Sequence, residues 1–210
     1  MPTNQKKIVN KNSKQFKAAL EVLRQGGTVV FPTETTYGLA ADATNHKAVE
    51  RLAKIKGRGT KVMSTIVADM SMALRFVKMS SVAKKLAKWL WPGPLTMVLP
   101  VKALAMDRLS PRCLKDGLMA VRVSSHELAR LLSKELKRPI VATSANLAGK
   151  TDCYSVRSVK QQYKTRRLQP DMYLDVGVLP RRKPSTIIKI SGQEIETLRA
   201  GSVKINKNHV

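Results

Sequence analysis

The sequence predicts a single-domain α/β fold, in which a twisted mixed β-sheet is flanked by helices. Short apolar runs rich in β-branched residues alternate irregularly with amphipathic stretches of helical period along the whole chain. The 210 residues, 43% of them hydrophobic, are enough for one substantial core, and the chain shows no internal repeat and no second domain. We expect the core to extend from about residue 12 to residue 201, with short basic tails.

The N-terminal part of the chain contains the stretch around which the other elements are organised. Residues 13–25 have the apolar spacing of an amphipathic helix, and the β-branched run Thr28–Phe31 predicts a buried strand. Residues 33–37 all carry hydrogen-bonding side chains and predict a polar turn at the end of that strand. Asn45 is a suitable N-cap for the next helix, which ends in a glycine-spaced basic pair at 56–58.

The remaining elements follow from the same patterns. Strands are expected at 62–68, 95–101, 118–123, 139–142, 172–176 and 185–190. Helices are expected at 70–78, after Ser80, after Ser125 and at 156–163. Residues 104–117 and 164–170 lack a clear period and are predicted to be loops.

Composition narrows the classes of function. The net charge of +25, from 39 basic and 14 acidic residues, favours contact with polyanions such as nucleotides or RNA. A uniform lysine bias would give the same total without any dedicated surface. No apolar run approaches membrane-spanning length, so no membrane partner is expected. Cys113 and Cys153 are far apart and predict reduced thiols of a cytoplasmic protein, and no His, Cys or carboxylate spacing predicts a metal site.

Three polar turns are candidates for a binding site. The turn at 33–37 follows a strand, which is where α/β sheets bind ligands. Lys56 and Arg58 alternate across a glycine, as Ser144 and Asn146 do across an alanine, and either pair suits a phosphate. Each pair also has a simpler interpretation. Lys56 and Arg58 can be a basic helix end, and Ser144 and Asn146 can form a Ser or Asx turn. The chain has neither a P-loop nor a G-x-G-x-x-G motif.

Arg122 lies within the apolar run 118–123, where an unpaired charge would be costly. A substrate carboxylate or carbamate is a suitable partner for it. The alternative is a structural ion pair with one of the few acids, such as Glu34 or Asp42.

The order of these motifs resembles the Sua5/YciO/YrdC family, the threonylcarbamoyl-AMP synthases. The matching segments are PTETTYGL (32–39), KGR (56–58), WPGPLT (91–96), AVRV (120–123), TSAN (143–146), PSTII (184–188) and LRAG (198–201). The length resembles the short bacterial form of the family. The chain departs from the family pattern at Gly59 and Ser124, where proline is usual, and at the polar stretch 63–65.

The resemblance implies a role for particular residues. The nucleotide and phosphate site would comprise Lys56, Arg58, Thr143, Ser144, Asn146, Ser155 and Arg199, with Lys56 and Arg58 also stabilising charge during catalysis. The threonine site would comprise Thr33, Tyr37, Arg122 and Ser185. No residue is assigned to a metal by the motifs.

The reaction implied by the resemblance joins L-threonine, bicarbonate and ATP into threonylcarbamoyl-AMP and pyrophosphate, with Mg²⁺ assisting. The product would serve threonylcarbamoyladenosine formation in tRNA, with tRNA bound directly or through a downstream transferase complex. One alternative is an RNA-binding protein of the same fold without synthase activity, although the chain has few aromatic residues and no recognisable RNA-binding motif. Another is a relative that uses a different substrate.

Overall fold

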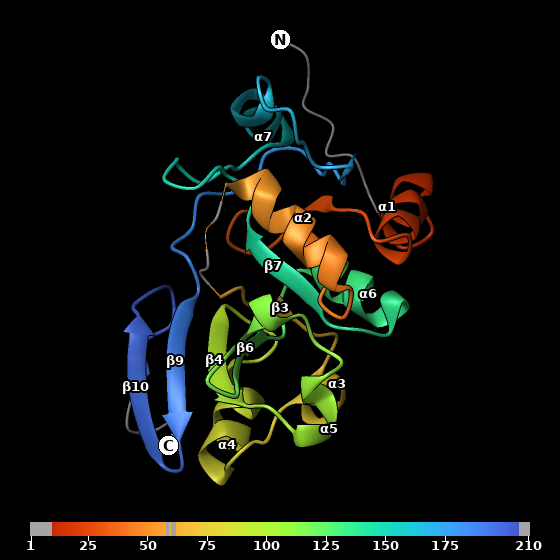
Figure 1. The fold of residues 1–210 in the computed structure, drawn as a ribbon. Coiled ribbons are helices and arrows are strands. Elements are labelled where there is room, and N and C mark those ends of the chain that lie inside the picture. The colour runs from red at the N-terminus through yellow and green to blue at the C-terminus, as the bar shows by residue number, and fades with distance from the viewer. Residues whose placement is uncertain (1–9, 58, 60–61, 206–210) are drawn as a thin grey trace.

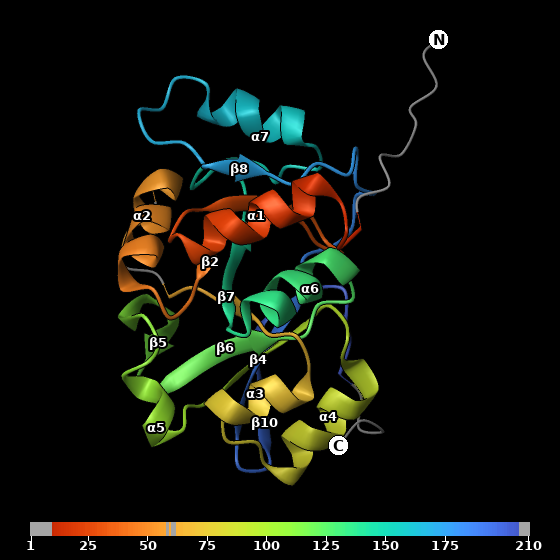
Figure 2. The ribbon, with the colours of Figure 1, turned by 90° about the vertical axis from the view of Figure 1, so that its right-hand side faces the viewer.

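The computed structural model describes residues 10–57, 59 and 62–205, and within them it shows a mixed sheet with helices on both faces (Figures 1 and 2). The helices are α1 (Lys14–Arg24), α2 (His46–Lys56), α3 (Met70–Phe76), α4 (Ser81–Leu90), α5 (Ala103–Met106), α6 (Glu127–Leu136) and α7 (Val156–Tyr163), with a 3-10 turn at Pro111–Cys113. The strands are β1 (Val29–Pro32), β2 (Tyr37–Asp42), β3 (Thr65–Ile66), β4 (Leu95–Pro100), β5 (Leu114–Lys115), β6 (Leu118–Arg122), β7 (Ile140–Ser144), β8 (Met172–Tyr173), β9 (Thr186–Ser191) and β10 (Glu194–Arg199). The predicted fold class is confirmed.

The sheet has the strand order β10-β9-β4-β6-β3-β7-β2-β1-β8, and β5 pairs with β6 beside this path. Strands β1–β8, β3–β6 and β4–β9 pair in parallel, and the other neighbours are antiparallel. The centre of the sheet is therefore built from strands that are far apart in sequence.

The two faces of the sheet have different coverings. On one face, Leu39 and Val141 belong to a large core with the buried sides of α2, α3, α4, α5 and α7. On the other face, Ala40 and Ile140 belong to a smaller core with α1 and α6. Figure 2 shows α1 and α6 lying next to each other across this second face. Successive residues of a strand point to opposite faces, so each strand contributes to both layers.

Helix boundaries follow local chemistry. The Ser13 side chain accepts a hydrogen bond from the backbone N–H of Phe16 at 3.2 Å and begins α1, and Asn45 does the same for Ala48 at 3.0 Å in α2. Gly57 ends α2 in the left-handed region, with φ +64°. Ser80 caps α4. These predicted starts are confirmed.

Several sequence expectations were wrong. The predicted strand 62–68 is a strand only at Thr65–Ile66, and the predicted loop 104–117 contains most of α5, the 3-10 turn and β5. Helix α6 begins after His126 rather than after Ser125. No sequence pattern indicated β2 or the full length of β10. Strand β2 is rich in glycine and alanine, which have low strand propensity, and it forms because strands on both sides pair with it.

Among the described residues, no helix is long and apolar enough to cross a membrane.

Candidate functional site

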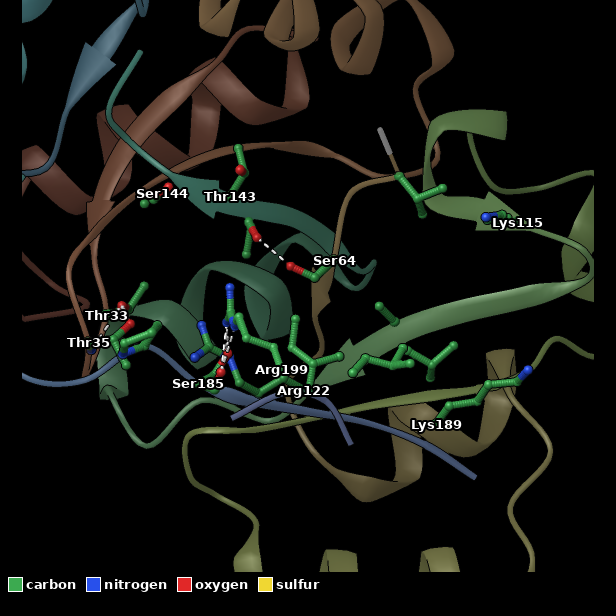
Figure 3. Close-up of a pocket in the computed structure, with 18 of the residues that line it drawn as sticks. Thr33, Thr35, Ser64, Lys115, Arg122, Thr143, Ser144, Ser185, Lys189 and Arg199 are labelled. Carbon is green, nitrogen blue, oxygen red and sulfur yellow. Dashed lines mark hydrogen bonds between the residues drawn. The ribbon is translucent and has the colours of Figure 1, made fainter. Parts of the chain in front are cut away.

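A cavity of about 500 Å³ opens on the face of the sheet that also carries α1 and α6 (Figure 3). Its floor includes Leu118, Ala120 and Arg122, the alternate residues of β6. The intervening residues, Met119 and Val121, are buried in the large core on the other face. The volume lies in the range of small-molecule sites.

The turn after β1 forms one wall, with Thr33, Thr35 and Thr36 lining the cavity. The Thr33 hydroxyl accepts from the backbone N–H groups of Thr35 and Thr36, each at 3.2 Å, and donates to the Thr36 carbonyl at 2.7 Å. Because this one hydroxyl forms three hydrogen bonds to backbone groups of the turn, it fixes the shape of the wall. Thr33, which is predicted to bind the L-threonine substrate, therefore lines the cavity with its hydroxyl already hydrogen-bonded within this turn.

Lys56 organises the turn that follows β7. Its ammonium donates to the carbonyl oxygens of Ser144 and Asn146 at 2.5 and 2.9 Å, and also contacts their side-chain oxygens at 3.3 and 3.2 Å. Lys56 is only 4% exposed. Ser144 lines the cavity, whereas Lys56 and Asn146 lie behind it. The three candidate turns lie together among the described residues, because the backbone N–H of Ala145 also donates to the Tyr37 carbonyl at 2.8 Å.

Three of the other predicted nucleotide residues differ in where they lie. Thr143 lines the cavity next to Ser144. Ser155 does not line it, and its side chain forms a capping box with Ser158 at the start of α7. Arg58 lies outside the described residues.

The late part of the chain supplies a third wall through Ser185 and Arg199, which both line the cavity. The Arg199 guanidinium donates to the Ser185 carbonyl at 2.7 Å and to the Ser185 hydroxyl at 2.8 Å (Figure 3). The Ser185 hydroxyl also lies 3.2 Å from the Thr96 hydroxyl. Gly201 packs so closely on Pro184 and Ser185 that a β-carbon would collide with their backbone. The glycine of the LRAG segment is therefore required for this close approach.

Arg122 forms the ion pair with Glu34 that the alternative interpretation predicted, and it also lines the cavity. A substrate carboxylate or carbamate as its partner stays a prediction. Nη1 of Arg122 donates to a Glu34 carboxylate oxygen at 2.8 Å, and the two side chains are 10% and 5% exposed. The hydroxyl of Ser124 donates to the second oxygen of Glu34. Burial lowers the pKa of the Arg122 guanidinium, and the Glu34 carboxylate opposes that shift.

Tyr37 follows the turn formed by residues 33–36 and is not part of the cavity lining. Its hydroxyl donates to the Gly177 carbonyl at 2.8 Å and accepts from the Val176 N–H at 3.0 Å. Burial raises the pKa of Tyr37 well above its ordinary value, partly offset by the hydrogen bond from Val176. The tyrosine fixes the segment after β8 against β2, and a contact with threonine stays a prediction.

Charged residues that the sequence analysis missed extend the cavity away from Arg122. Lys115 and Lys189 line its far end in Figure 3, and Asp116, Asp152 and Glu196 also contribute to the lining. The alternation of polar and apolar residues along β9 indicates that Lys189 shares a face with Ile187. Among the described residues, no group of three or more His, Cys, Asp or Glu side chains is arranged to hold a metal ion.

A sequence model of the Sua5/YciO/YrdC family, described as telomere recombination, matches residues 21–201. The chain belongs to this family.

Two curated relatives carry the name threonylcarbamoyl-AMP synthase. The protein of Vibrio vulnificus strain YJ016 is 35% identical over 172 residues, which are 80% of this chain and 89% of that protein. The protein of Pyrococcus abyssi is 32% identical over 197 residues, which are 92% of this chain but only 56% of the relative. The chain thus spans little more than half the length of the Pyrococcus protein.

The fold is similar to the crystal structure of Pyrococcus abyssi Sua5 complexed with L-threonine. The TM-score is 0.80 at 32% identity, and the match covers 89% of this chain and 54% of that one.

Proposed function

We propose that the chain is an L-threonylcarbamoyladenylate synthase, which forms threonylcarbamoyl-AMP and pyrophosphate from L-threonine, bicarbonate and ATP. The observation that carries the proposal is the composition of the cavity. Thr33, Arg122 and Ser185 line it for an amino acid, and Thr143 and Ser144 line it for a nucleotide beside the turn held by Lys56. Arg199, the other proposed nucleotide residue, is hydrogen-bonded to Ser185. The similarity to a Sua5 structure that contains L-threonine supports this use of the cavity.

The proposed chemistry has two bond-forming steps. The neutral amine of threonine attacks the carbon of bicarbonate, with loss of water, to give a carbamate. A carbamate oxygen then attacks the α-phosphorus of ATP, and the bond to the departing pyrophosphate breaks. The proposed site residues include no nucleophile or base for these steps, so the protein would act by placing the reactants and by stabilising phosphate charge with its cations.

Mg²⁺ would accompany the nucleotide in this proposal. The carboxylates at the cavity are single residues, Asp116, Asp152 and Glu196, and the described residues form no three-carboxylate cage. Such a donor set fits Mg²⁺ that arrives on the triphosphate and keeps most of its ligands there. The bound ion would neutralise charge on the phosphates.

Pyrophosphate release is the direct test. The purified chain is expected to release pyrophosphate only when L-threonine, bicarbonate and ATP are all present. Isothermal titration should also show L-threonine binding that Ser185→Ala weakens, because that hydroxyl lies at the wall beside Arg199. Release that is equally fast with other amino acids would favour a family member with a different substrate. Absence of release together with tight RNA binding would favour the RNA-binding alternative.

We also propose that the chain contacts tRNA or a tRNA-bound partner, and that it works in the cytoplasm. Exposed cations lie in the last turn of α7 and between α7 and the cavity wall at Pro184, namely Lys160, Lys164, Arg166, Arg167, Arg181, Arg182 and Lys183. The two cysteines are buried free thiols, which suits a reducing compartment.

A salt series separates a dedicated RNA surface from background charge. Replacing Arg166, Arg167 and Arg182 by glutamate should weaken tRNA binding and reduce the slope of log affinity against log salt. The matched control reverses three exposed lysines elsewhere, Lys85, Lys134 and Lys137. Equal loss in both variants would show that the net charge acts without a dedicated surface.

A further inference from the structure

A buried charged network lies directly behind the wall of the cavity. Glu34 is held through both carboxylate oxygens, by Arg122 at 2.8 Å and by the hydroxyl of Ser124. The Ser124 hydroxyl also accepts from the backbone N–H of His126, and the Ser124 carbonyl accepts from Nη1 of Arg130 at 2.7 Å. Ser124 is fully buried. The carboxylate is therefore fixed from the end of β6 and from α6.

The network joins two walls that are not neighbours in the sheet. Glu34 belongs to the turn after β1, and Arg122 is the last residue of β6. Strands β3, β7 and β2 separate β6 from β1 in the sheet order. The ion pair therefore sets the position of the threonine-rich turn relative to Arg122.

Glu34 does not itself line the cavity, although Thr33, Thr35 and Thr36 on either side of it do. Its side chain is 5% exposed and reaches Arg122 from outside the cavity lining. Arginine has five N–H donors in a planar fork. Among the described residues, Glu34 is the one acceptor that hydrogen-bonds to the Arg122 guanidinium, through Nη1, which leaves other donors for a ligand carboxylate.

We infer that Glu34 is a positioning residue, which holds the Arg122 guanidinium in the orientation that receives the carboxylate of the amino-acid substrate. This inference rests on the proposed function for its substrate. Without Glu34, the long Arg122 side chain would sample several rotamers in the cavity. The substrate would then have to order it on binding, which lowers affinity.

The chain offers a closely matched control. Asp42 is another buried carboxylate, 2% exposed, that pairs with an arginine, Arg138, at 2.7 Å. Asp42 and Arg138 do not line the cavity. The variants Glu34→Gln and Asp42→Asn thus make the same chemical change at a buried carboxylate. Glu34 pairs with the nearly buried Arg122 behind the cavity, whereas Asp42 pairs away from the cavity lining with Arg138, whose side chain is 53% exposed.

Titration with L-threonine tests the inference. Glu34→Gln is expected to weaken threonine binding about tenfold, which corresponds to one hydrogen bond to a charged group, and to leave ATP affinity within about twofold. In steady-state assays the KM for threonine should rise while kcat changes little. Glu34→Asp should restore part of the affinity, and Asp42→Asn should leave threonine binding unchanged. Ser124→Ala keeps the contact between Glu34 and Arg122 but removes the hydroxyl that binds the second Glu34 oxygen and the His126 N–H. It should give a smaller loss and serves if Glu34→Gln fails to fold.

A second readout needs no substrate. In the ¹⁵N spectrum of arginine-labelled protein, assigned with Arg122→Lys, the Arg122 guanidinium signal should be rigid in the parent and in Asp42→Asn but mobile in Glu34→Gln. An unchanged signal and unchanged threonine affinity in Glu34→Gln would overturn the inference. If the parent binds no threonine, the proposed substrate is wrong, and the spectrum still decides whether Glu34 fixes Arg122.

Discussion

Removing the ammonium of Lys56 should destabilise the whole fold, because that group joins the end of α2 to the turn after β7. In Lys56→Met the apolar stem is kept and the charged donor is lost. The two shortest contacts, to the carbonyl oxygens of Ser144 and Asn146, measure 2.5 and 2.9 Å. Hydrogen bonds from a charged group contribute about 1.5–3 kcal/mol each, so the free energy of unfolding should fall by about 3–6 kcal/mol.

That loss is large against the usual total stability of about 5–15 kcal/mol. For a chain of this size it corresponds to a decrease in Tm of at least about 6 °C. Urea unfolding followed by circular dichroism gives the free energy directly. Lys54→Met is the control, since Lys54 is exposed on the same last turn of α2 and should change stability by less than about 0.5 kcal/mol.

Equal unfolding free energies for Lys56→Met and Lys54→Met would refute this account of the turn. If the expected difference is found, ATP binding must be compared at a temperature where both variants are folded. Only then does a loss of affinity report on phosphate contact, because an unfolded Lys56 variant loses every ligand.

Two further predictions concern His126 and Gly201. Burial lowers the pKa of His126 below its ordinary value of 6.5, with Glu34 opposing the shift, so the unfolded chain binds a proton that the folded chain does not. The free energy of unfolding should therefore decrease as the pH falls from about 6.5 toward the folded-state pKa of His126. In urea titrations between pH 7.5 and 5.5, His126→Asn should show a smaller decrease than the parent. Parallel profiles of the two proteins would contradict this prediction. Gly201→Ala should displace Ser185 and lower both Tm and threonine affinity, because its β-carbon would collide with the backbone at Pro184 and Ser185; an unchanged Tm would show that the segment yields at little cost.

The parts of the fold that the sequence predicted are those decided by local chemistry. Ser13, Asn45 and Ser80 cap their helices because each side chain reaches a backbone N–H only three residues away. Strand β2 was missed because its small residues have little strand preference of their own. Its pairing partners β1 and β7 supply the hydrogen bonds, and β7 lies about a hundred residues later in the chain.

The candidate site shows the same division. The cost of a charge in an apolar run singled out Arg122, and the structure places it at the cavity with Glu34, one of the two acids considered as partners. The sequence predicted that Ser144 and Asn146 bind a phosphate, but it did not predict that the Lys56 ammonium donates hydrogen bonds to their carbonyl oxygens. Such a contact depends on where α2 ends relative to β7, which no local pattern encodes.

The alternation along β6 has a consequence for how the family can diversify. Met119 and Val121 are buried in the large core, whereas Leu118, Ala120 and Arg122 line the cavity. Mutations at the second set can alter which molecule is accepted without creating voids in the first. The constraints on Leu118 and Ala120 are therefore nearly independent of those on the core, whereas Arg122 is constrained both by the cavity and by its buried pair with Glu34.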